Sequence, residues 1–322
     1  MREVDIAIVG AGPTGLFAAY YAGFRGLSTA VIDALPEPGG QITAMYPEKD
    51  IFDVPGFPSI KGRDLVANLV AQAAPYAPEY LLGTVAQQLT FDAQQPVLGM
   101  ADGTALRCGA VIVTAGLGSF RPRPLPAAAT YPGAGIVHFV PRLADLAGQD
   151  VVIVGGGDSA FDWALALQPV ARSVTLVHRR ERFRAHAATV ARVRQLPVRI
   201  LVNAEVTGIH GDGRVTAIDI TLGDGGTETL PADSVVAALG FTADLGPLAT
   251  WGLRLHRRHI HVDSTMATNL PRVFAAGDIA DYPGKVRLIA TGFGEAATAV
   301  NNAAVTIDPS AHLFPGHSSE SG

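Results

Sequence analysis

The chain is almost free of cysteine: its 322 residues include one, Cys108. A single thiol cannot form a disulfide within the chain, so a disulfide framework and a dithiol relay are both excluded. Nothing in the cysteine content indicates an oxidising compartment, and we expect a cytoplasmic protein.

Charge is also sparse, with 16% charged residues against 48% hydrophobic ones. This balance is typical of a well-buried globular protein, and the length suits two domains. Lys and Arg number 24 and Asp and Glu number 29, giving a net charge of −5. That excess of acid argues against general nucleic-acid binding and against a polybasic membrane address.

An uncharged stretch from Ile6 to Phe24 follows Arg2 and Asp5 near the N-terminus. Its length raises the alternative of a signal peptide or a membrane span. The stretch is interrupted by Pro13 and several glycines, and a strand, a tight turn and a helix account for it better. We therefore expect no membrane segment.

Glycine is plentiful, and two glycine-rich loops repeat one pattern. Residues 10–15 (Gly-Ala-Gly-Pro-Thr-Gly) follow the apolar run 4–9, and residues 155–160 (Gly-Gly-Gly-Asp-Ser-Ala) follow the apolar run 151–154. Each loop lies between a predicted strand and a predicted helix, where backbone N–H groups can approach a pyrophosphate. Two such loops predict two bound dinucleotides, and the commonest use of two is electron transfer between them.

The remaining pattern places these loops in two similar units. The predicted strands are 4–9, 28–33, 111–114, 151–154, 174–177, 235–239 and 271–276, and the predicted helices are 16–26, 63–74, 158–167 and 292–304. A long Pro- and Gly-rich loop, 34–63, separates the second strand from the second helix, and loops of this length are usually functional.

The order of these elements predicts an α/β fold with two Rossmann-like nucleotide-binding domains, the second inserted in the first. The first domain is expected to comprise residues 1–115 and 241–322, and the second residues 116–240. The chain would cross between them twice, at 114–116 and 239–241, as a two-strand hinge.

The first glycine-rich loop has the features of a FAD site. Asp33 ends the second strand about 20 residues after the loop, where a carboxylate can accept hydrogen bonds from ribose hydroxyls. Two distant segments, 39–41 (Gly-Gly-Gln) and 277–278 (Gly-Asp), add further backbone N–H groups and a carboxylate. Contacts from distant segments favour a long cofactor, FAD. The predicted contacts from the loop itself are Gly10, Gly12, Pro13, Thr14 and Gly15, joined by Gly40 and Gly277.

The second loop predicts NADP(H) rather than NAD(H). Its second strand ends at His178 without a carboxylate and is followed by Arg179, Arg180 and Arg184. Arginines bind a 2′-phosphate through charge-assisted contacts, whereas an acid would repel it. The alternative is a solvated basic loop. The predicted contacts from the loop are Gly155, Gly157, Asp158 and Ser159.

Taken together, these motifs resemble the flavoprotein disulfide-reductase superfamily, in its low-molecular-weight thioredoxin reductase architecture. Where that enzyme carries its redox Cys-x-x-Cys, this chain has His138-Phe139-Val140-Pro141. The chain is more similar to the thioredoxin reductase-like ferredoxin/flavodoxin–NADP reductase family, over nearly its whole length. The motifs that carry this resemblance are 39–41, 46–49 (Tyr-Pro-Glu-Lys), 118–120 (Gly-Ser-Phe), 155–160, 178–180 (His-Arg-Arg), 183–186 (Phe-Arg-Ala-His), 264–269 (Ser-Thr-Met-Ala-Thr-Asn), 277–279 (Gly-Asp-Ile), 292–296 (Gly-Phe-Gly-Glu-Ala) and 317–319 (His-Ser-Ser).

The resemblance implies roles for individual residues. Tyr46 would stack on one face of the isoalloxazine, and His317 would cover the other, often from the partner subunit of a homodimer. Its implied FAD contacts are Asp33, Gln41, Ala86, Phe120, Asp278 and Ser319.

The implied function is a FAD-dependent ferredoxin or flavodoxin–NADP+ oxidoreductase. Hydride would pass between NADP(H) and FAD, and single electrons would pass to an iron–sulfur or flavin carrier protein. We expect no metal and no acid–base residue. An acidic carrier would need a basic patch on this acidic chain, for which Lys61, Arg63, Arg121 and Arg123 are candidates. The alternatives are an NADPH diaphorase or oxidase that reduces quinone, free flavin or oxygen, and a non-catalytic FAD/NADPH redox sensor.

Overall fold

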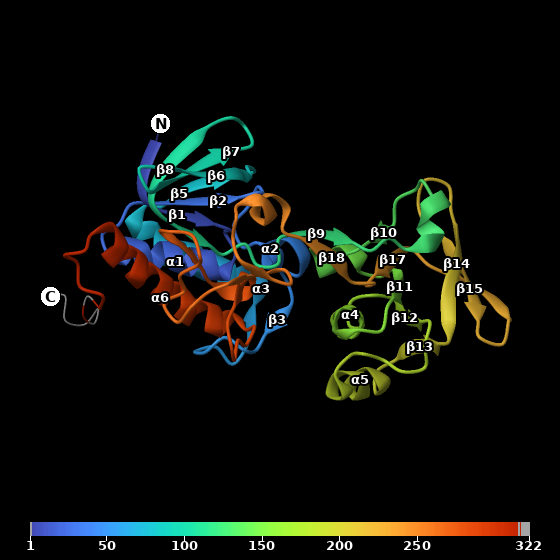
Figure 1. Cartoon of the computed structure of the whole chain (residues 1–322). Helices are drawn as coiled ribbons and strands as arrows, with labels where there is room; N and C mark the ends of the chain where they lie inside the picture. The colour runs from blue at the N-terminus through green and yellow to red at the C-terminus, as the bar shows by residue number, and fades with distance from the viewer. Residues whose placement is uncertain (1, 315, 317–322) are drawn as a thin grey trace. The chain divides into compact units, whose positions relative to one another are not determined.

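A computed structural model describes residues 2–314 and Gly316. The chain divides into two units, which are described separately (Figure 1). Unit 1 comprises Met1–Ser119 and Ala243–Gly322, and unit 2 comprises Phe120–Thr242. Strands β9 (Ser119–Pro122) and β18 (Phe241–Asp244) pair with each other where the chain passes between the units.

Unit 1 is built on a mixed sheet with strand order β5-β2-β1-β8-β7-β6, and β21 pairs with β8. The strands β5, β2, β1, β8 and β21 are parallel, whereas β6 and β7 form an antiparallel extension. Buried aliphatic side chains such as Ile6, Ile8 and Ile112 fill the core. The strand bounds are β1 Arg2–Val9, β2 Thr29–Asp33, β5 Glu79–Leu82, β6 Ala86–Asp92, β7 Gln95–Met100, β8 Ala105–Val113 and β21 Val273–Ala275.

Helices α1 (Pro13–Phe24), α3 (Gly62–Ala73) and α6 (Ile289–Ile307) pack together in this unit. Helix α1 begins at Pro13, earlier than the expected start at Leu16, because proline is preorganised for the first helical position. The expected loop 34–63 contains a short helix and a hairpin, α2 (Gln41–Met45), β3 (Asp50–Ile51) and β4 (Ile60–Lys61). A further small sheet, β19-β20-β22, is formed by Leu255–His256, His259–His261 and Ala280–Asp281.

Unit 2 has a five-stranded parallel sheet with order β10-β17-β11-β12-β13, accompanied by helices α4 (Asp158–Leu167) and α5 (Ala187–Arg194). An antiparallel meander, β14-β15-β16, completes the unit. The bounds are β10 Ile136–Val137, β11 Asp150–Val154, β12 Ser173–His178, β13 Val198–Val202, β14 Ala204–His210, β15 Ala217–Leu222, β16 Thr227–Pro231 and β17 Ser234–Ala237.

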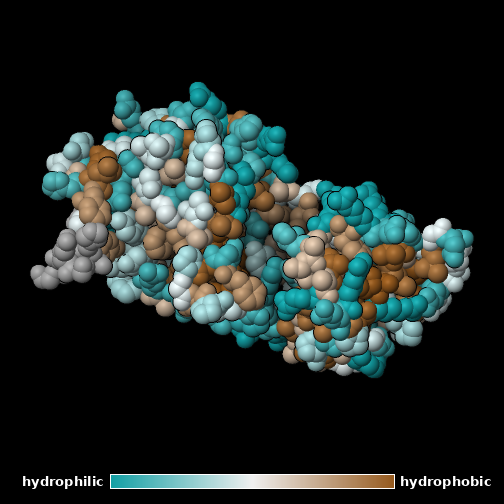
Figure 2. All heavy atoms as spheres, turned by 90° about the horizontal axis from the view of Figure 1, so that it is seen from below, coloured by the Kyte–Doolittle hydropathy of each residue, from teal (hydrophilic) through white to brown (hydrophobic). Residues whose placement is uncertain are grey.

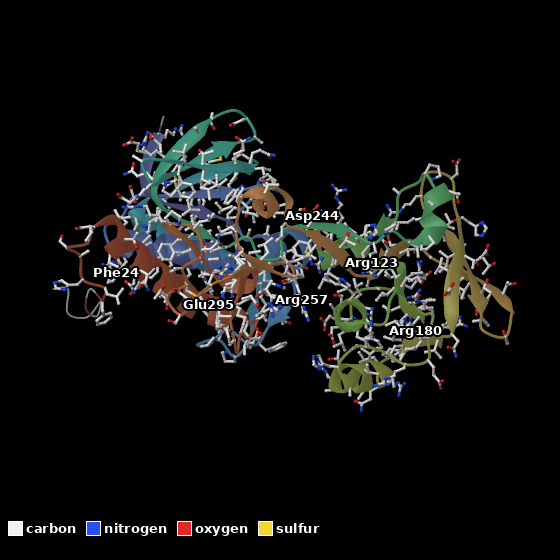
Figure 3. The ribbon with its side chains drawn as sticks, viewed as in Figure 1. Phe24, Arg123, Arg180, Asp244, Arg257 and Glu295 are labelled. Carbon is white, nitrogen blue, oxygen red and sulfur yellow. The ribbon has the colours of Figure 1, made fainter. Side chains whose placement is uncertain are left out.

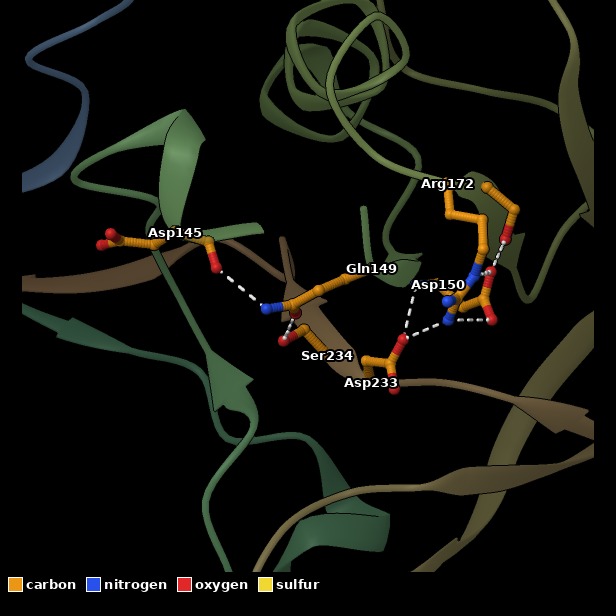
Figure 4. Close-up of polar contacts among 7 residues, drawn as sticks. Asp145, Gln149, Asp150, Arg172, Asp233 and Ser234 are labelled. Atoms are coloured by element: carbon orange, nitrogen blue, oxygen red, sulfur yellow. Dashed lines mark hydrogen bonds and ion pairs between the residues drawn. The ribbon is translucent and has the colours of Figure 1, made fainter. Parts of the chain in front are cut away.

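One arginine ties together the amino ends of the central strands of unit 2 (Figure 4). Arg172 donates to both carboxylate oxygens of Asp150, at 3.0 and 2.7 Å, and to Asp233 at 2.6 Å. Hydrogen bonding from Arg172 and Ser173 lowers the pKa of Asp150, so the carboxylate stays ionised. These contacts lie at one edge of the sheet, and the carboxyl ends of the strands remain available for a ligand.

Figure 2 shows hydrophilic and hydrophobic residues mixed on one face of each unit, with the hydrophobic residues gathered in patches; apolar atoms make up much of the surface of any folded protein. Within residues 2–314, no helix has the length and apolar character needed to cross a membrane.

Candidate functional site

The first glycine-rich loop joins β1 to α1, and close packing requires glycine inside it. A Cβ atom on Gly15 would lie 1.9 Å from the carbonyl oxygen of Gly10, which no side chain can tolerate. A Cβ on Gly12 would meet no atom within 4 Å. Gly12 also caps α1, whose first N–H groups have no side-chain cap. The loop therefore presents open space and free backbone donors at a helix N-terminus, the arrangement that binds a pyrophosphate.

Asp33 ends β2 beside this loop. Its carboxylate accepts hydrogen bonds from the backbone N–H groups of Ala11, at 2.6 Å, and Leu35, at 2.8 Å. Each carboxylate oxygen can accept more than one hydrogen bond, so these contacts orient the group and leave capacity for ribose hydroxyls.

Two distant segments meet the loop, as the sequence predicts. The N–H of Gly39 donates to the carbonyl of Ala11 at 2.7 Å, and a Cβ on Gly40 would lie 3.1 Å from the Cα of Gly12. On the other side, the hydroxyl of Thr14 lies 2.8 and 2.4 Å from where a Cβ on Gly277 or Gly292 would be. Residues from α1, α6 and the Gly-Asp turn (residues 277–279) therefore converge on one place.

Two ionisable side chains beside this place, Tyr46 and Asp278, have raised pKa values. Burial raises the pKa of Tyr46, and the negative charges of Asp278 and Asp53 raise it further. Burial likewise raises the pKa of Asp278, against the opposing effects of Lys285 and Arg287. Both side chains are partly buried. Lys49 lies over the Tyr46 ring, 5.8 Å from its centroid.

The Gly-Asp turn is supported by a buried ion pair that sequence reasoning did not find. Glu295 and Lys285 pair with side chains only 5% and 3% exposed. Glu295 accepts from the N–H of Gly277 at 2.7 Å and from the Tyr282 hydroxyl at 2.6 Å, and Lys285 donates to the carbonyl of Gly277 at 2.9 Å. Figure 3 labels Glu295 on α6. The sequence contained one sign that Glu295 has a special role, since it is the one charged residue in α6.

The second glycine-rich loop repeats this geometry in unit 2. A Cβ on Gly156 would lie 2.3 Å from the imidazole of His178, and one on Gly155 would lie 2.4 Å from the carbonyl of Ala238. A Cβ on Gly157, which caps α4, would meet nothing within 4 Å. Asp158 accepts from the N–H of His186 at 2.8 Å, and Ser159 is exposed in the first turn. The loop again offers open space at a helix N-terminus.

A basic segment lies directly beside the second loop. The N–H of Arg184 donates to the carbonyl of Gly156 at 2.8 Å, which fixes residues 179–184 against the glycines. Burial lowers the pKa of His178, and the positive charges of Arg179, Arg180 and Arg184 lower it further. Arg179, Arg180 and Arg184 are exposed and form no ion pair with any acidic residue that the structure describes. Figure 3 labels Arg180 in this segment. Glu181 lies within the segment and Glu205 lines a pocket with Arg179, but the arginines outnumber these acids and are free to contact a phosphate.

The other predicted residues are distributed as follows. Ala86 is buried at the start of β6 in unit 1. Phe120 belongs to unit 2, where its ring meets Phe241 edge to face with centroids 6.1 Å apart. Gln41 begins α2, and its amide nitrogen lies 3.2 Å from the Cβ position of Gly116. His317 and Ser319 lie outside the described residues.

The chemistry that the site can use is limited by what is absent from it. Cys108 is buried in the core of unit 1, and burial raises the pKa of its thiol to about 12. Among residues 2–314, no group of three or more His, Cys, Asp and Glu side chains is arranged to hold a metal ion. The geometry therefore offers two open glycine-rich loops at helix N-termini and no reactive thiol.

Comparison with known proteins agrees with this geometry. Residues 4–303 match the model of the pyridine nucleotide-disulphide oxidoreductase family. The chain is 76% identical to a ferredoxin–NADP reductase of Salinispora arenicola, covering 99% of both chains. It is 64% identical to a ferredoxin–NADP reductase of Saccharopolyspora erythraea, covering 99% of this chain and 98% of the relative.

Among solved structures, T. acidophilum thioredoxin reductase superposes with a TM-score of 0.79 at 27% identity, covering 96% of this chain and 99% of that one. The fold is thus the two-domain α/β fold of thioredoxin reductase, as the sequence predicted. With two Gly-rich nucleotide cradles on that fold, the chain belongs to the pyridine nucleotide-disulphide oxidoreductase family, within its thioredoxin reductase-like ferredoxin–NADP reductases.

Proposed function

We propose that this protein is a FAD-dependent ferredoxin–NADP+ oxidoreductase. The observation that carries the proposal is the pair of open glycine-rich loops, the second of which lies beside three exposed arginines that form no ion pair with any described acidic residue. Names of relatives support it, since the full-length relatives at 64–77% identity are ferredoxin–NADP reductases. With Cys108 as the one cysteine and buried, thiol relay chemistry is excluded for this chain.

We assign FAD to unit 1, which we propose as the FAD-binding domain. The N-terminus of α1 and Gly12 would hold the pyrophosphate, Asp33 a ribose, and the Gly-Asp turn with Gln41 the flavin end. Tyr46 would stack on the isoalloxazine, and its raised pKa keeps the phenol neutral there. Bound FAD would supply the capacity to take up two electrons and release them one at a time.

We assign NADP(H) to unit 2, the proposed NADP(H)-binding domain. The N-terminus of α4 and Gly157 would hold the pyrophosphate, and Arg179, Arg180 and Arg184 would hold the 2′-phosphate. Because His178 is kept neutral by burial and by these arginines, it adds no charge of its own to this contact.

Two glycine variants distinguish an effect on cofactor binding from an effect on the stability of the fold. Gly12→Ala should fold normally but lose FAD affinity roughly tenfold or more, because its methyl group would occupy the place of the pyrophosphate. Gly15→Ala should destabilise unit 1 by about 3 kcal/mol, because its methyl group overlaps the carbonyl of Gly10. Flavin content and thermal melting, each with and without added FAD, measure both effects. Excess FAD should restore the melting temperature of Gly12→Ala alone, and equal rescue of both variants would contradict the assignment.

We also propose a homodimer in the cytoplasm. Support comes from an aromatic cluster on α1, where Phe17, Tyr20, Tyr21 and Phe24 are only partly buried and contact one another. Figure 3 labels Phe24 at the end of this helix. Aromatic side chains that stay partly accessible are enriched at protein–protein interfaces.

The experiment that tests the function is NADPH-dependent cytochrome c reduction by the purified flavoprotein, with and without ferredoxin. We expect the rate of cytochrome c reduction to depend strongly on added ferredoxin. The same assay with flavodoxin tests the second possible carrier. Fast flavin reduction by NADPH without any ferredoxin effect would contradict the proposal. That result would favour a diaphorase that uses quinone, free flavin or oxygen.

A further inference from the structure

Residues 254–261 of unit 1 form a short hairpin of basic side chains. The segment, here called the basic hairpin, reads Arg-Leu-His-Arg-Arg-His-Ile-His and contains no acidic residue. Strands β19 and β20 pair so that Leu255 faces Ile260 and His256 faces His259. Leu255 and Ile260 pack into the core of the unit.

The pleat of the hairpin directs its polar residues away from that core. Because side chains alternate along a strand, the residues on either side of Leu255 and Ile260 share the opposite face. These residues are Arg254, His256, His259 and His261, and all but the partly buried His259 are exposed. Arg257 and Arg258 are exposed at the tip, where Arg257 has the left-handed φ of 59°. Figure 3 labels Arg257 at this tip.

The arginines of the basic hairpin differ from Lys61 and Arg63, the cations near the proposed flavin site that the sequence suggested, in having no ion-pair partner among the described residues. Lys61 pairs with Asp50 at 3.3 Å, and Arg63 pairs with Glu48 at 2.9 Å. In contrast, no acidic residue in the described part of the chain forms an ion pair with Arg254, Arg257 or Arg258. The nearest polar partner of Arg258 is the carbonyl of Ala243, at 2.9 Å. The hairpin thus concentrates three uncompensated charges on a chain whose net charge is −5.

The basic hairpin lies beside the Gly-Asp turn that we assign to the flavin. Strand β20 pairs with β22, and β22 begins immediately after this turn, with His261 opposite Asp281. Asp281 accepts from His256 at 2.7 Å and from Arg287 at 3.2 Å. The charged groups that interact electrostatically with the His259 imidazole are Arg287, Asp281, Arg258 and Asp278. Val286 and Leu288, which flank Arg287, are 55% and 42% exposed and supply apolar area next to the charges.

We propose that the basic hairpin, with Arg287 and its apolar neighbours, is the docking surface for an acidic iron–sulfur carrier protein. The inference rests on the proposed function and adds the place where the carrier binds. An acidic carrier is repelled by the net charge of this chain, so its approach needs a local positive surface close to the electron donor. Apolar residues bordered by charged ones have the composition of a transient interface.

The test compares three double variants of equal charge in the holoenzyme. Arg254→Gln with Arg257→Gln alters the basic hairpin. Lys61→Gln with Arg63→Gln alters the competing cations, and Arg192→Gln with Arg214→Gln alters exposed arginines of unit 2. A purified bacterial ferredoxin of net negative charge is the probe, and the KM for it is measured over a range of ionic strengths. NADPH-dependent ferricyanide reduction is measured alongside as the activity that needs no carrier.

We expect the hairpin variant to raise the KM for ferredoxin roughly tenfold at low ionic strength and to weaken its salt dependence. Its ferricyanide reduction should match that of the unaltered protein. An unchanged KM for ferredoxin, or an equal effect in either of the other variants, would overturn the docking assignment alone. If ferredoxin does not stimulate even the unaltered protein, the proposed function fails as well.

Discussion

Neutralising Arg179 and Arg180 together should remove most of the preference for NADPH over NADH. Both side chains are exposed beside the second glycine-rich loop and have no ion-pair partner among the described residues, so a 2′-phosphate would supply their missing counter-charge. A hydrogen bond to a charged group contributes about 1.5–3 kcal/mol. Losing two such contacts, about 3–6 kcal/mol together, should lower kcat/KM for NADPH roughly 100- to 10,000-fold. The value for NADH should change little, because NADH has no phosphate there.

The measurement is kcat/KM for each nucleotide with ferricyanide as acceptor, for Arg179→Gln/Arg180→Gln and for Arg192→Gln/Arg214→Gln as the charge-matched control. The control should retain the preference for NADPH. A parallel fall for NADPH and NADH in the test variant would mean that the arginines support the loop rather than recognise the phosphate. An unchanged ratio of the two values would refute the NADP(H) assignment.

The two glycine-rich strand–turn–helix loops could be predicted from the sequence because local physics determines them. A buried strand, a glycine turn and a helix follow one another directly in the chain, and their spacing allows one geometry. The same holds for the approach of residues 39–41 and 277–278 to the first loop, since a long cofactor needs contacts from distant segments. The antiparallel strands β6, β7, β14, β15 and β16 were not predicted. Strand β6 is mostly exposed and gives a weak signal, whereas β14 and β15 alternate apolar and polar residues and carry a period of two that indicates strands.

The ion pairs and the charged surface around the site could not be predicted from the sequence in the same way. Lys61 and Arg63 look like free cations in the sequence, but in the fold each meets a carboxylate. The basic hairpin could not be identified as a surface from the sequence, because only the register of β19, β20 and β22 shows which residues share its outer face. Burial of the Glu295–Lys285 pair depends on tertiary packing that no local pattern encodes.

Removing one partner of the Glu295–Lys285 pair should therefore have a large effect. In Glu295→Gln the ammonium group of Lys285 stays buried without a counter-charge, and Gly277 and Tyr282 lose a charged acceptor. Breaking a buried pair in this way costs about 3–5 kcal/mol. Because Glu295 and Lys285 hold the N–H and the carbonyl of Gly277, the loss should also release FAD at a lower temperature.

Thermal release of flavin fluorescence and urea unfolding of the holoenzyme measure both effects. The matched control is Glu79→Gln, which removes the partner of Arg2 in an exposed pair of the same unit. Its effect should stay below about 1 kcal/mol, because solvent screens exposed pairs.

A double variant separates the cost of an unpaired charge from the value of the pair. Lys285→Met/Glu295→Leu removes both charges, so its free energy of unfolding should exceed that of Glu295→Gln even though more polar contacts are lost. Its FAD should still dissociate faster than in the unaltered protein, because neither backbone group of Gly277 regains a side-chain partner. If the double variant is instead less stable than both the unaltered protein and Glu295→Gln, the ion pair contributes net stability. If it retains FAD as well as the unaltered protein, Gly277 needs no side-chain support, and the turn is positioned by its backbone and by Thr14 packing alone.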